Sequence, residues 1–78
     1  MTLEYVRKQR GLLFLKVGMR VKLEYGKTVK HGVITGGNSS GNINVRFDGE
    51  THSKNCHPKW AITYYDDNGE IIKQQPES

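Results

Sequence analysis

The chain lacks most of the features that mark secreted, membrane-spanning and large catalytic proteins. It contains a single cysteine, Cys56, so no disulfide can form within it and nothing indicates an oxidising compartment. Its longest apolar run, Leu12–Leu15, is far too short for a signal peptide or a membrane span. A domain of 78 residues buries only about 60% of its unfolded surface, which leaves little room for an enclosed active site. We therefore expect a cytoplasmic binding module that is not an enzyme and needs no cofactor.

Acidic residues are scarce in the first part of the chain. Residues 1–30 hold eight lysine and arginine residues against two glutamates, whereas residues 31–78 hold four basic and six acidic residues. A basic segment attracts phosphate backbones because binding releases counterions. Nucleic acid is therefore the first candidate partner, although small proteins also carry a few net charges for solubility alone.

Residues for metal binding or covalent catalysis are also few. His52, Cys56 and His57 lie close together in the sequence, but a structural zinc site needs four ligands. The adjacent Cys56 and His57 would point to opposite faces of a strand, which also argues against a nucleophilic Cys-His pair. The two carboxylates at 66–67 precede Asn68-Gly69, a sequence typical of a turn. We expect no metal site and no catalytic residue.

Apolar and polar residues alternate along several short segments, as they do in half-buried β-strands. In the clearest segment, 42–48, Ile43, Val45 and Phe47 alternate with polar residues before an Asp-Gly turn. Gly32 interrupts another segment, which predicts a bulge or a sharp bend at that position. The remaining predicted strands are 17–25, 28–36, 51–57 and 61–65, followed by a turn at 66–69 and a return through 70–72.

Both ends of the chain differ from this central part. Residues 1–16 form a basic N-terminal extension, in which Leu3–Arg10 follows a helix-capping residue, Thr2, and precedes Gly11. This pattern predicts one or two helical turns, with a frayed tail as the alternative. The Leu12–Leu15 segment is expected to anchor the extension to the sheet, because four exposed apolar residues would promote aggregation. We assign 17–72 to one β-barrel and 73–78 to a polar tail.

Three short motifs suggest a family of folds: Val17-Gly18-Met19-Arg20-Val21, His31-Gly32-Val33-Ile34 and Asn44-Val45-Arg46-Phe47-Asp48-Gly49. Over residues 17–65 the chain resembles the small SH3-like barrels of the Tudor and KOW style. The resemblance implies a mainly β fold, a five-stranded antiparallel barrel that in different proteins serves nucleic-acid binding or protein binding. The stretch 52–64 also resembles the ends of small phage- or prophage-encoded proteins of unassigned function, which implies a bacterial cytoplasm.

Basic side chains on the predicted outward faces form the candidate binding site, with the solvated face as the alternative. The nucleic-acid-binding residues that we predict are Arg20, Lys22, Lys30, Arg46 and Lys59. Pairing of the first two strands would bring Lys22 and Lys30 close together, and Tyr65 is the predicted stacking residue. The Tudor resemblance implies a different use of aromatics, a cage of Tyr25, Trp60 and Tyr65 for a methylated side chain.

A protein-interaction module without nucleic-acid contact is the alternative function. It would use the Leu12–Leu15 segment and an exposed sheet edge, because edge strands pair readily with another chain. A homodimer is one form of this alternative. The sequence leaves the choice between monomer and homodimer open.

Overall fold

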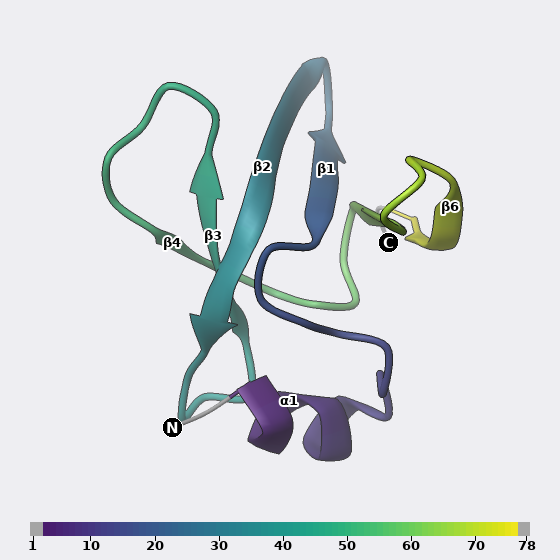
Figure 1. The fold of residues 1–78 in the computed structure, drawn as a ribbon. Helices are drawn as coiled ribbons and strands as arrows, with labels where there is room; N and C mark the ends of the chain where they lie inside the picture. The colour runs from purple at the N-terminus through teal and green to yellow at the C-terminus, as the bar shows by residue number, and fades with distance from the viewer. Residues whose placement is uncertain (1–2, 77–78) are drawn as a thin grey trace.

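The computed structural model describes residues 3–76, so the predicted capping residue Thr2 lies outside the described residues. These residues form one helix and six strands (Figure 1). The elements are α1 (Leu3–Arg10), β1 (Arg20–Tyr25), β2 (Thr28–Gly37), β3 (Ile43–Phe47), β4 (Lys54–Cys56), β5 (Ile62–Tyr65) and β6 (Ile71–Gln75). The mainly β fold and the helix in the extension are as the sequence predicts.

All six strands belong to one antiparallel sheet in the order β4-β3-β2-β1-β5-β6. The molecule measures 30 × 27 × 26 Å, and these nearly equal dimensions require the sheet to curl around its core. The sheet does not close, because β4 and β6 each have a neighbour on one side only among the described residues. The architecture is therefore an open six-stranded sheet, where we had expected a five-stranded barrel.

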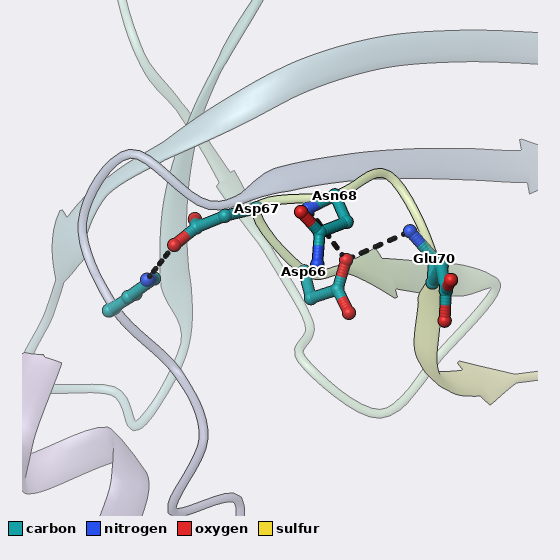
Figure 2. A network of polar contacts seen from close by, with 5 residues as sticks. Asp66, Asp67, Asn68 and Glu70 are labelled. Carbon is teal, nitrogen blue, oxygen red and sulfur yellow. Dashed lines mark hydrogen bonds and ion pairs between the residues drawn. The ribbon is translucent and has the colours of Figure 1, made fainter.

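The turn before β6 is held by hydrogen bonds to the side chain of Asp66 (Figure 2). The Oδ1 atom of Asp66 accepts hydrogen bonds from the backbone N–H groups of Asn68 and Glu70, at 2.8 and 2.9 Å. This geometry returns the chain antiparallel to β5, and Gln75 pairs with Ile62 at the end of the ladder. Residues 73–75, which we assigned to a polar tail, are thus part of a strand.

The N-terminal extension is built into the core. Leu3 and Val6 of α1 and Leu12 and Leu15 beyond it are buried together with the inward side chains of the sheet. In Figure 1 the helix lies at the end of the sheet where β2 finishes and β3 begins. Arg10 ties it there, because its guanidinium donates hydrogen bonds to the backbone oxygen of Gly41 and to Asn42. The predicted anchoring of Leu12–Leu15 is confirmed, with Leu13 alone fully turned to solvent.

Gly32 is not the bulge that its place in the sequence suggests. It pairs regularly with Val21 on one side and Phe47 on the other, while the irregularity of β2 lies between Ile34 and Gly36. Glycine is needed at this position for another reason. A Cβ atom there would lie 2.6 Å from the backbone oxygen of Arg46, far inside contact distance.

Candidate functional site

Three of the predicted cationic residues lie on the face of the sheet that points away from the core. Val21 and Leu23 are buried on β1, so Arg20 and Lys22 alternate to the outside. The register places Arg20 opposite Val33 and Val33 opposite Arg46, so two arginines flank a valine in one row across three strands. We name this surface the outer patch, made of Arg20, Lys22, Val33 and Arg46.

A groove runs beside the outer patch. It has a volume of about 490 Å³ and is lined by Arg20, Val33, Arg46 and residues 47–51, which end β3 and begin the loop to β4. Its lining includes the guanidinium groups of Arg20 and Arg46 and the carboxylates of Asp48 and Glu50.

Ion pairs reduce the charge that two of these cations offer to a ligand. Arg20 donates two hydrogen bonds to the carboxylate of Asp48, each 2.9 Å long, and these raise the pKa of Arg20 and lower that of Asp48. Lys22 lies 3.1 Å from Glu24, whose hydrogen bond raises the pKa of Lys22. Arg46 has no acidic side chain within ion-pair distance among residues 3–76, although its charge, after that of Arg20, helps to lower the pKa of Asp48.

Lys30 does not belong to the outer patch, and the expectation that it meets Lys22 is wrong. The register pairs Lys22 with His31 and Lys30 with the buried Leu23, so the two lysines project from opposite faces. The Nζ atom of Lys30 lies 5.2 Å above the ring of Phe47 and 3.7 Å from Glu50. Successive side chains of a strand point to opposite faces, so His31 shares the face of Lys22 and Lys30, one residue earlier, points to the other face.

His31, and not Lys30, is the β2 residue that lies beside Lys22 on the outer face of the sheet. The imidazole is exposed and stands directly across from Lys22. A signal was present in the sequence, because the turn Gly26-Lys27 joins two strands directly. A two-residue hairpin loop pairs Tyr25 with Thr28. Three residues further from the turn on each strand, the same register pairs Lys22 with His31.

Lys59 and the aromatic side chains occupy a different part of the molecule. Lys59 precedes Trp60 in the turn between β4 and β5, and the Trp60 ring stacks on Tyr25 with centroids 5.5 Å apart and planes 10° apart. Tyr65 lies close to Lys22 instead, since Glu24 first and then Tyr65 raise the pKa of Lys22. Tyr64, the residue before Tyr65, pairs with Val21 of β1. Val21 and Tyr25 are four residues apart, which is about 13 Å along an extended strand. The three aromatics therefore do not form one cage.

The histidine and cysteine residues show no arrangement for metal chemistry. Cys56 is buried, and burial raises the pKa of its thiol, whereas His57 beside it is exposed. Within residues 3–76, no three side chains of histidine, cysteine, aspartate or glutamate are grouped to hold a metal ion.

Comparisons with protein families, with curated proteins and with solved structures found no match to this chain. In the described part of the chain, no helix has the length and apolar character needed to cross a membrane.

Proposed function

We propose that this chain is a non-enzymatic nucleic-acid-binding module of the SH3-like class that contacts the phosphate backbone through the outer patch. The observation that carries the proposal is the row of Arg20, Val33 and Arg46 along the groove. Arginine side chains suit phosphate because their planar, permanently charged groups donate paired hydrogen bonds. Contacts of this kind position a nucleic acid without identifying its sequence.

The strand connections support the SH3-like part of the proposal. Strands β1 to β4 follow one another as neighbours, and β5 crosses back to pair with β1. In this proposal β1 to β5 correspond to the barrel strands, and β6 is an addition at the edge. A phosphate chain in the groove competes with Asp48 for Arg20, while Arg46 is ready for contact.

The proposal is tested by measuring affinity for labelled oligonucleotides as a function of salt. With contacts from Arg20, Lys22 and Arg46, the logarithm of the binding constant should fall with the logarithm of salt with a slope of about −2 to −3. Arg46→Gln should weaken binding and reduce that slope by about one. Lys8→Gln is the matched control, since it removes one positive charge from the exposed side of α1. Absence of binding at low salt, or equal effects of the two variants, would refute the proposal.

A second candidate function, protein binding, is favoured by one observation at the sheet edge. Strand β6 pairs with β5 alone, and Ile71 at its start is 58% exposed. Such an edge is able to accept a strand from another chain, including a second copy. The Leu12–Leu15 segment does not serve this role, because Leu12 and Leu15 are buried. Light scattering tests the homodimer form: a dimer that Ile71→Lys converts to a monomer supports it, and a monomeric wild type excludes it.

A further inference from the structure

Trp60 is the side chain whose exposure the proposed function leaves unexplained. It is the single tryptophan of the chain and is 38% exposed, although its large ring would gain much from burial. One side of the ring is covered by Tyr25, which lies parallel to it at a centroid distance of 5.5 Å. The ring is thus presented to solvent in a defined orientation instead of being packed into the core.

The turn that carries Trp60 is held from several sides. Pro58 is buried, and its backbone oxygen accepts a hydrogen bond from the hydroxyl of the buried Tyr64. Ala61 adopts a φ of 53°. This left-handed conformation is unfavourable for any residue that carries a Cβ atom. Hydrogen bonds from Glu24 N–H to the oxygen of Ala61, 2.9 Å, and from Ala61 N–H to that of Pro76, 3.2 Å, keep it there. Trp60 is therefore oriented before any ligand arrives.

Two lysines lie next to the stacked pair of Tyr25 and Trp60 in the sequence. Lys59 precedes it, and Lys27 lies two residues beyond Tyr25 in the turn between β1 and β2. Neither lysine has an acidic side chain within ion-pair distance in the described part of the chain. Glu24, which precedes Tyr25 and bonds Ala61 through its backbone N–H, has its carboxylate paired with Lys22.

The stacked rings and the two lysines favour an anionic ligand over a cationic one. A methylated lysine or arginine needs aromatic rings set around a cation, but Tyr25 and Trp60 lie against each other and leave no space between them. The neighbouring lysines would also repel a cation. A ligand with a flat apolar group on an anionic backbone satisfies both the ring and the charges, and a nucleotide has this chemistry.

Resting on the proposed function, we infer that Trp60, supported by Tyr25, is a stacking platform for a nucleobase, with Lys59 and Lys27 beside its phosphates. The faces of bases in a duplex are covered by their neighbours, whereas those of a single strand are accessible. The ligand class is therefore single-stranded nucleic acid. Tyr65, the residue that the sequence suggests for stacking, is half-buried next to Lys22 and is less suited to this role.

The test uses the intrinsic fluorescence of the wild-type protein, because Trp60 is its single tryptophan. Titration with single-stranded oligo(dT) should quench the emission in step with binding, which is followed independently by anisotropy of the labelled oligonucleotide. A duplex of equal length should quench little. Trp60→Leu should weaken binding of the single strand about 5- to 150-fold, while Trp60→Phe, which keeps an aromatic face, should retain most of the affinity. Tyr5→Leu removes an exposed aromatic side chain on α1 and should leave binding unchanged.

The outcomes separate this inference from the proposed function. Salt-sensitive binding without quenching, with Trp60→Leu binding as tightly as the wild type, would overturn the stacking platform and leave nucleic-acid binding in place. Failure of every oligonucleotide to bind at low salt would remove both. Quenching by a trimethyllysine peptide and not by oligo(dT) would replace the nucleotide with a cationic ligand. Circular dichroism of each variant shows whether the fold is kept, and quenching of the wild type decides the matter even if Trp60→Leu does not fold.

Discussion

Replacing Gly32 with alanine should destabilise this protein through a clash between strands. Gly32 lies in the middle of β2, between β1 and β3, and pairs with residues on both. An added Cβ would lie 2.6 Å from the backbone oxygen of Arg46 and 3.0 Å from the Cα atom of Phe47. Backbone atoms of a paired strand cannot rotate away as a side chain does, so β2 and β3 must move apart locally.

The size of the effect follows from the contact. Overpacking a well-packed interior costs about 1–3 kcal/mol, and a clash with backbone belongs in the upper part of that range. A protein of 78 residues has a total stability of about 4–12 kcal/mol at the usual value per residue. A loss of about 2–3 kcal/mol lowers the melting temperature of such a domain by about 8–24 °C. The variant should therefore fold but melt well below the wild type.

Gly36→Ala is the matched control in the same strand. The nearest atom to its added Cβ is Nδ2 of Asn44 at 3.9 Å, an ordinary contact, so its stability should change by less than about 0.5 kcal/mol. Urea unfolding followed by Trp60 fluorescence and by circular dichroism measures both variants. If Gly32→Ala proves as stable as Gly36→Ala, the close approach of β2 and β3 is not as described and the reasoning fails.

Two further predictions concern the core and the outer patch. Leu15→Ala should cost about 2–5 kcal/mol of stability because the leucine side chain is 1% exposed. Leu13→Ala should be nearly neutral because Leu13 is 73% exposed. Equal unfolding midpoints of the two variants in urea would contradict the packing of the extension. Hydrogen bonds from Arg20 lower the pKa of Asp48, so this pair should stabilise the fold above the ordinary aspartate pKa and lose that effect as acid protonates Asp48. NMR titration of the Asp48 carboxyl should show a midpoint that Arg20→Gln moves upward; an unmoved midpoint would show that the pair does not form in solution.

The charge distribution shows why a candidate site is harder to predict than a fold. The first thirty residues are strongly basic, yet acids of the second part of the chain lie against them. Lys16 pairs with Asp67, Arg20 with Asp48 and Lys30 with Glu50, each from a distant position. Two other arginines serve the fold, since Arg7 donates to the backbone oxygen of Leu15 and Arg10 holds the loop before β3. A net charge counted along the sequence therefore overstates the charge that the surface offers.

Local patterns in the sequence were sufficient for most strands. The alternation of Ile43, Val45 and Phe47 determined both the strand and the side that is buried, because successive side chains point to opposite faces. The helix of Leu3–Arg10 and its end at Gly11, with a φ of 68°, likewise depended on residues close in sequence. These features need no knowledge of distant partners, since neighbouring residues decide them.

Only the tertiary structure decided the features that depend on distant pairs. The burial of Leu3 and Val6 against the sheet and the stacking of Trp60 on Tyr25 each join segments that no local pattern relates. The register of β1 and β2 placed Lys30 on the inner side and Lys22 on the outer side. Curling of the sheet brings such segments together, and burial of apolar surface, which has no direction of its own, selects the arrangement that the whole chain can satisfy.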